Sequence, residues 1–198
     1  SNGVLSRRTP VKKGIDTGKN DLFVRYWYEV NEQKLSRYNK DLKWFTYIKG
    51  GTLRKWFGNT ELVVNWENDG LEIKKYKGST IRNKDYIKKQ AITWSLTGSN
   101  GFGARYVHPN CVFDNNGSSV FPEANVEFII GYLNSVVTLK ILGILNPTLA
   151  FQVGDIARIP IFWDESFKYS NLVKENIMIS KKDWDSRETS CDFKQTPL

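Results

Sequence analysis

The chain has 198 residues, of which 40% are hydrophobic and 14% are aromatic, and this composition excludes a disordered chain and predicts a folded domain with a substantial core. Its net charge of +8 is unevenly distributed. Residues 1–105 hold 21 basic and 10 acidic side chains, a balance of +11, whereas residues 106–198 hold 8 and 11, a balance of −3. This asymmetry predicts a first part that binds a polyanion and a second part that packs against it.

Several classes of protein are disfavoured by what the sequence lacks. Its two cysteines, Cys111 and Cys191, have no regular spacing and indicate a reduced intracellular protein rather than a disulfide scaffold. No signal peptide is visible, and the longest apolar run, residues 126–145, is interrupted by Asn134, Ser135 and Lys140. We therefore expect a cytoplasmic protein that has no membrane partner.

In chain order, residues 1–21 are predicted to form an extended basic arm, with a disordered arm as the alternative. Runs of β-branched and aromatic residues predict strands at 22–30, 44–48, 61–66 and 91–96. Residues 52–57 are predicted to form a further short strand between glycine turns. A turn is expected at 68–70 and a short exposed helix at 82–90.

The second part of the chain is predicted to be mainly helical. Residues 112–113 and 119–121 bracket the turn 114–117 and predict a hairpin. A long apolar helix is expected to begin at Pro122-Glu123, run through Leu142 and end at Asn146-Pro147. An extended segment at 150–162, a polar helix at 169–177 and a short helix capped by Ser180 are expected to follow.

These elements predict an α+β fold. Residues 1–121 are expected to form a basic, β-rich lobe built on a mixed, twisted sheet or a partly open barrel. Residues 122–198 are expected to supply a long supporting helix and short C-terminal helices of the same domain. No internal repeat is visible.

The most unusual stretch is KGGTLRKWFGN at residues 49–59, which combines three cations, three glycines and two large aromatic side chains. Lys49, Arg54 and Lys55 are suited to holding phosphates, and only arginine can also make a two-point contact with a guanine edge. The alternative interpretation is a solvated turn beside a core tryptophan. Arg25, which lies between aromatic residues of the 22–30 run, is a further candidate for stacking.

Signals for catalysis are weak. GSNGFG at residues 98–103 is not followed by a helix-opening pattern, and no Asn-Pro-Pro-aromatic motif is present. His108 is the only histidine, and with two cysteines it cannot complete an ordinary zinc site. Glu61, Glu72 and Lys74 form the alternative of a small magnesium-dependent nuclease.

The chain resembles the target-recognition region of the large adenine-specific DNA methyltransferases of the BREX phage-defence and type IIG restriction-modification group. The matching pieces are TGKNDLFVRYWYEV at 17–30, KWFTYIKGGTLRKWFGNTELVVNW at 43–66, ITWSLTGSNGFGAR at 92–105, FDNNGSSVF at 113–121, LNSVVTLKILGILNPTLAFQVGDIARIPI at 133–161 and SKKDWDSRETSCDF at 180–193. Cys191 departs from the tryptophan expected in the family's usual ending.

The resemblance implies a module that binds duplex DNA and directs methylation by an upstream methyltransferase domain, which would hold S-adenosylmethionine and the catalytic motif. We expect no catalytic, metal-binding or cofactor-binding residue in this chain. Lys49, Arg54, Lys55, Asn59 and Arg105 are expected to position the DNA backbone or to shape the lobe, and the loops 74–77 and 98–102 to contact bases. The predicted DNA-binding residues are therefore Arg25, Lys49, Arg54, Lys55, Asn59, Lys74, Lys75, Lys77, Ser99, Asn100 and Arg105.

A third hypothesis is a protein-interaction module of the same system, in which the apolar helix and the acidic end pack on other subunits.

Overall fold

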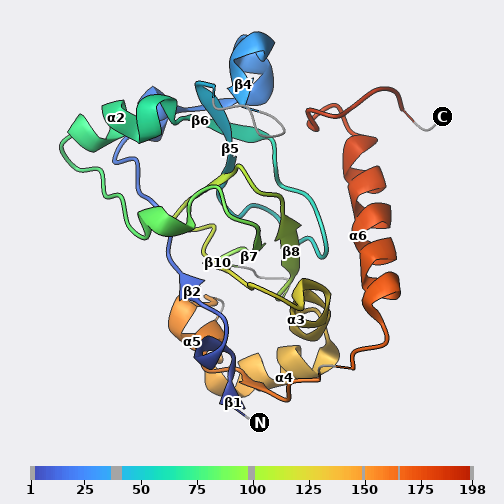
Figure 1. The fold of residues 1–198 in the computed structure, drawn as a ribbon. Helices are drawn as coiled ribbons and strands as arrows, with labels where there is room; N and C mark the ends of the chain where they lie inside the picture. Colours follow the sequence, from blue (N-terminus) through green and yellow to red (C-terminus); the bar gives the residue numbers. More distant parts are fainter. Residues whose placement is uncertain (1–2, 37–41, 98–100, 149, 165, 197–198) are drawn as a thin grey trace.

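The computed structural model describes residues 3–36, 42–97, 101–148, 150–164 and 166–196. The described chain has an α+β fold in which open, twisted sheets are covered by helices (Figure 1), as the sequence predicts. No closed barrel forms among the described strands.

The largest sheet is mixed and has the strand order β3-β6-β5-β4, with β9 paired to the end of β5. Strands β3 and β6 and strands β6 and β5 are antiparallel, whereas β4 and β9 run parallel to β5. Its strands are β3 (Val24–Tyr26), β4 (Leu35–Ser36), β5 (Trp44–Ile48), β6 (Leu62–Asn65) and β9 (Val112–Phe113).

A second sheet is antiparallel and has the order β2-β10-β7-β8, and a small two-stranded sheet pairs β1 with β11. The second sheet contains β2 (Val11–Lys12), β7 (Ala91–Trp94), β8 (Ala104–Val107) and β10 (Ser119–Val120). The small sheet contains β1 (Gly3–Val4) and β11 (Pro160–Ile161).

Helices surround these sheets (Figure 1). The α-helices are α1 (Asn20–Phe23), α2 (Glu67–Lys75), α3 (Val126–Leu133), α4 (Val136–Leu145), α5 (Val153–Ala157) and α6 (Ser170–Asp185). Short 3-10 turns lie at Leu5–Arg7, Trp27–Glu29, Glu32–Lys34 and Lys84–Tyr86.

Two hydrophobic clusters fill the interior. The first joins the second sheet to α3, α4 and α5, with Ile92 and Trp94 packed in one cluster with Ile129, Ile130 and Leu133. The second lies under the mixed sheet and contains Phe45, Val64, Trp66 and Ile73. Residues on both sides of position 121 contribute to the first cluster, so the β-rich and helical parts share one core.

The expected single long helix is wrong, because α3 and α4 are separate helices bent by 62° at Asn134-Ser135. The Asn134 side chain leaves the helix to bond with the backbone of Ala104 in β8. The Ser135 hydroxyl then accepts from the backbone N–H of Thr138 and caps α4. Helix α3 also begins at Val126 rather than at Pro122, because Asn125 in front of it is left-handed.

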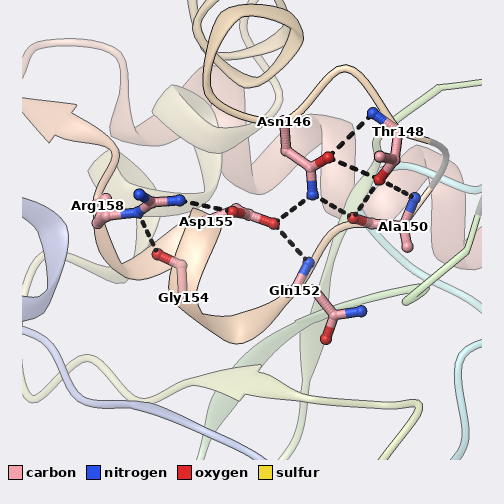
Figure 2. Close-up of polar contacts among 7 residues, drawn as sticks. All are labelled: Asn146, Thr148, Ala150, Gln152, Gly154, Asp155 and Arg158. Carbon is pink, nitrogen blue, oxygen red and sulfur yellow. Dashed lines mark hydrogen bonds and ion pairs between the residues drawn. The ribbon is translucent and has the colours of Figure 1, made fainter.

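The 150–162 segment is not simply extended, because a polar network folds it into α5 (Figure 2). The Asp155 carboxylate accepts from the Asn146 side chain at 2.6 Å, the backbone N–H of Gln152 at 3.1 Å and the Arg158 guanidinium at 2.9 Å. The Asn146 amide also donates to the carbonyl of Ala150 at 2.8 Å. These contacts tie the end of α4 to α5.

Other predicted elements are shorter or differently paired. The predicted hairpin at 112–121 is wrong, since β9 pairs with β5 and β10 pairs with β2 and β7. Within 22–30 only Val24–Tyr26 is a strand, and within 82–90 only one 3-10 turn forms. Ser180 is not a cap, because α6 continues through it to Asp185.

Candidate nucleic-acid interface

The 49–59 stretch covers the edge of the second sheet instead of forming the predicted strand. The backbone N–H of Trp56 donates to the carbonyl of Ala104 at 2.7 Å, and the N–H of Tyr106 donates to the carbonyl of Trp56 at 2.8 Å. Trp56 has a φ of 73°, which regular strands do not adopt. The stretch therefore protects β8, an edge strand, at one position only.

Asn59 and Arg105 are internal supports of this stretch. The Asn59 amide is buried and donates to the carbonyls of Gly50 and Thr52, both at 2.8 Å. Arg105 is 1% exposed, and its guanidinium donates to the Gly50 carbonyl and to the Ser95 hydroxyl, both at 3.2 Å. Burial lowers the pKa of Arg105 to about 10, against the raising effect of Glu61. Both side chains hold the loop in shape and do not face solvent.

Arg54 and Lys55 fasten the helical part to the loop. The Arg54 guanidinium pairs with Asp183 of α6 at 2.6 Å, lies 5.1 Å from the ring centroid of Trp184 and donates to the Phe57 carbonyl at 3.1 Å. The hydrogen bond from Arg54 lowers the pKa of Asp183. The Lys55 ammonium donates to the backbone carbonyl of Asn134 at 3.2 Å, where α3 ends.

Arg25 and Lys49 are both half-buried. The Arg25 guanidinium donates to the carbonyls of Asp21 and Val24, both at 2.7 Å. Burial raises the pKa of Asp114, and the nearby charge of Lys49 acts in the opposite direction.

Lys74 and Lys75 are the last residues of α2, and Lys77 follows the helix; all three are exposed. The start of this element is left-handed, with φ values of 51°, 57° and 72° at Asn68, Asp69 and Gly70, so only a short right-handed turn follows. Ile73 anchors that turn in the second hydrophobic cluster, whereas the neighbouring Lys74 and Lys75 are exposed. The predicted site residues Ser99 and Asn100 lie outside the described residues.

The exposed lysines of α2 belong to a larger basic surface that the chain order does not reveal. We call it the lysine surface, and it comprises Lys12, Lys13, Lys19, Lys74, Lys75, Lys77, Arg82, Lys84 and Lys89. Residues 12–19 run beside residues 76–90 at the edge of the molecule (Figure 1). Asp16 and Thr80 exchange backbone hydrogen bonds of 2.8 Å, and the Asn83 amide donates to the Lys13 carbonyl at 2.8 Å.

Tyr86 gathers two of these cations from distant segments. The ammonium groups of Lys12 and Lys89 lie 5.2 Å and 5.1 Å from the centroid of its ring. Within the described parts of the chain, no cation of the lysine surface forms an ion pair with a carboxylate. Such a surface can hold phosphates without first breaking internal ion pairs.

Lys12, Lys13 and Lys19 belong to the stretch predicted to be an arm, but the structure places Lys12 in β2. Arg82, Lys84 and Lys89 are not among the predicted site residues. The sequence does show several basic residues in each of the segments 12–19 and 74–89, which is the one feature that could have indicated the lysine surface. Their pairing through Asp16 and Thr80 could not be read from it.

A separate hollow of about 220 Å³ lies between the β5–β8 region and the end of α6. Its lining includes His108, Cys111, Lys181, Cys191 and Asp192. Burial raises the pKa of the Cys111 thiol to about 12, so this sulfur is not an activated nucleophile. Burial, followed by the charge of Lys181, lowers the pKa of His108.

The nuclease alternative gains no support from the described residues. Among them, no group of three or more His, Cys, Asp and Glu side chains could hold a metal ion. The Glu72 carboxylate instead accepts a 2.6 Å hydrogen bond from the Asn65 amide. Within the same residues no single helix is long and apolar enough to span a membrane, and α3 and α4 reach that length and composition only together, across their bend.

Comparison with known proteins shows that this α+β domain is homologous to a segment of PglX-like adenine-specific methyltransferases, which confirms the resemblance to that group of methyltransferases. The chain is 39% identical over 196 residues to the adenine-specific methyltransferase BrxX of Escherichia coli O9:H4 (strain HS), a match that covers 96% of this chain. It is 36% identical over 197 residues, 92% of this chain, to the adenine-specific methyltransferase PglX of Lacticaseibacillus casei (strain Zhang). The chain spans 16% of the length of each relative. No family model matches it.

Proposed function

We propose that this chain is a DNA-recognition domain of a BREX adenine-specific methyltransferase and that it binds duplex DNA through the lysine surface. The observation that carries the proposal is the set of nine cations, brought together from two segments, that have no carboxylate partner among the described residues. The same segments also carry the exposed carboxylates Asp16, Glu72 and Asp85, so the nine cations leave an excess of positive charge. Phosphates of duplex DNA balance that excess, and release of their counterions favours binding. The homology to adenine-specific methyltransferases makes DNA the expected polyanion.

In this proposal the predicted site residues divide into two roles. Lys74, Lys75 and Lys77 contact the DNA backbone directly, because they are exposed and form no ion pair with a described residue. Lys55 is also exposed, but its ammonium group is bonded to the Asn134 carbonyl. Arg54, Asn59, Arg105 and the neighbouring Lys55 act indirectly by shaping the loop and fixing α6. Base reading by Ser99 and Asn100 stays a prediction. Methylation, with its S-adenosylmethionine, belongs to a catalytic domain elsewhere in the parent protein.

Fluorescence anisotropy with a random-sequence duplex across a salt series tests the proposal. For Lys74→Ala/Lys75→Ala/Lys77→Ala we expect weaker binding. The slope of the logarithm of the binding constant against the logarithm of the salt concentration should become less negative by about 0.9 per lost phosphate contact. The matched control is Lys168→Ala/Lys182→Ala/Lys194→Ala, which removes the same charge from exposed positions outside the lysine surface and is expected to keep the original slope. Equal losses in the two triple variants, or a slope near zero for the unmodified chain, would overturn the proposal.

A further inference from the structure

One face of α4 is unusually apolar for a helix that meets solvent. Val136, Val137, Leu139 and Ile144 are 67%, 53%, 44% and 83% exposed. At about 100° per residue, these four positions share one arc of the helix with Lys140 and Gly143, which are also exposed. Thr138 and Leu142 occupy the opposite side and are buried.

A helix face that stays in water normally carries charged and polar side chains. The α4 face carries a single charged residue, Lys140, among four large apolar side chains. Helix α6 provides the internal comparison, because its exposed Leu172, Met178 and Ile179 alternate with charged residues such as Glu175 and Lys182. A contiguous apolar surface such as that of α4 marks an interface.

We propose that the α4 face packs against another segment of the same full-length methyltransferase. Because this chain spans only 16% of its relatives' length, most of the parent polypeptide lies outside it. Lys140 forms no ion pair with any described residue. The complementary surface is therefore an apolar groove with a carboxylate placed opposite Lys140.

The α4 face is separate from the lysine surface. Helix α4 packs with α3 and α5 on the first hydrophobic cluster, whereas Ile73, which anchors the lysine-bearing turn of α2, belongs to the second cluster. Helix α2, which carries Lys74 and Lys75, and helix α4 lie in different parts of the molecule (Figure 1), whereas β2, which carries Lys12, lies beside α5. This inference rests on the α4 side chains and on the length of the relatives, so it does not depend on DNA binding.

Photo-crosslinking in the full-length methyltransferase tests the proposal directly. A benzophenone amino acid replaces Ile144, and in a matched protein it replaces Ile179, an equally branched and 60% exposed position on α6. We expect the probe at position 144 to crosslink within the same polypeptide to a segment outside this chain, and the probe at 179 not to do so. Crosslinks from 144 to a second copy, to lipid or to a different protein would overturn the proposal, as would the absence of any crosslink.

A charge placed on the face gives a second, independent readout. We expect Ile144→Lys to lower the melting temperature of the full-length protein and to accelerate its proteolysis, and Ile179→Lys to change neither. Both variants are expected to keep the salt dependence of DNA binding. Equal effects of the two substitutions on melting and proteolysis would show that the α4 face is uncovered.

Discussion

Replacing Asn134 by alanine is expected to destabilise the chain by about 2–4 kcal/mol. Asn134 is 8% exposed; its Oδ1 accepts from the backbone N–H of Ala104 and its Nδ2 donates to the Ala104 carbonyl, both at 2.9 Å. Truncation leaves the Ala104 N–H buried without this partner, while the carbonyl keeps the 2.7 Å bond from Trp56. An orphaned buried donor costs about 1–3 kcal/mol and the second lost bond about 0.5–1.5 kcal/mol.

The measurement is the free energy of unfolding from urea titrations followed by tryptophan fluorescence. Asn171→Ala is the control, because it makes the same chemical change at an exposed position in the first turn of α6. We expect the control to lie within about 0.5 kcal/mol of the unmodified chain. A loss below about 1 kcal/mol for Asn134→Ala, with an unchanged denaturant slope, would refute the assigned role of the Asn134 amide.

Three further outcomes are expected. Burial alone would raise the pKa of Asp155, but the hydrogen bonds that it accepts lower it overall, so the stability advantage over Asp155→Asn should be full at pH 7 and lost in urea titrations as the pH falls below about 4. Arg54→Ala should speed proteolysis of α6 and raise the pKa of Asp183 in an NMR titration, and an unchanged pKa would contradict their pairing. Gly117→Ala should cost about 2–3 kcal/mol in the same titrations, because its Cβ would lie 2.0 Å from the Ile48 carbonyl oxygen, whereas Gly154→Ala, whose Cβ meets no atom within 4 Å, should be neutral or stabilising.

The central strands could be predicted from the sequence because local composition and burial agree there. Strand β5 has the predicted bounds, and β6 and β7 lie inside the predicted runs 61–66 and 91–96. Strands β5 and β7 combine β-branched and aromatic residues, and β6 carries Val63 and Val64 with Trp66 directly after it; these residues are buried in or beside the two hydrophobic clusters. No distant partner had to be known to recognise them.

Elements whose geometry depends on distant backbone could not be predicted. The alternation of residues 52–57 is compatible with a strand, but Trp56 is left-handed because its backbone bonds with Ala104 and Tyr106, some fifty positions later. The apolar pattern of residues 126–142 is compatible with one helix, and the break is explained by the bonds of Asn134 with the distant Ala104 together with the Ser135 cap of α4.

The sequence indicated which part of the chain is basic, but not which of its basic side chains are exposed and which are paired inside the fold. Arg54 and Lys74 are both basic residues in the same half of the chain, yet Arg54 pairs with Asp183, 129 residues away, while Lys74 is exposed. Arg105 is likewise interior. The gathering of Lys12 and Lys89 on one tyrosine ring required knowledge of which segments lie side by side. Charge counts report no such pairing.

The segment 112–120 links the two larger sheets. Its first residues pair with β5 in the mixed sheet, and its last residues pair with β2 and β7 in the second sheet. Residues 15 and 113–115, next to the lysine surface, exchange hydrogen bonds of 2.9 Å. One short piece of backbone thus couples the part that carries the lysines to the part that carries α4. If DNA binds the lysine surface and another segment of the parent protein packs on α4, as proposed above, this coupling would hold the two at a fixed separation. The number of base pairs between the bound DNA site and the methylated adenine would then be constant.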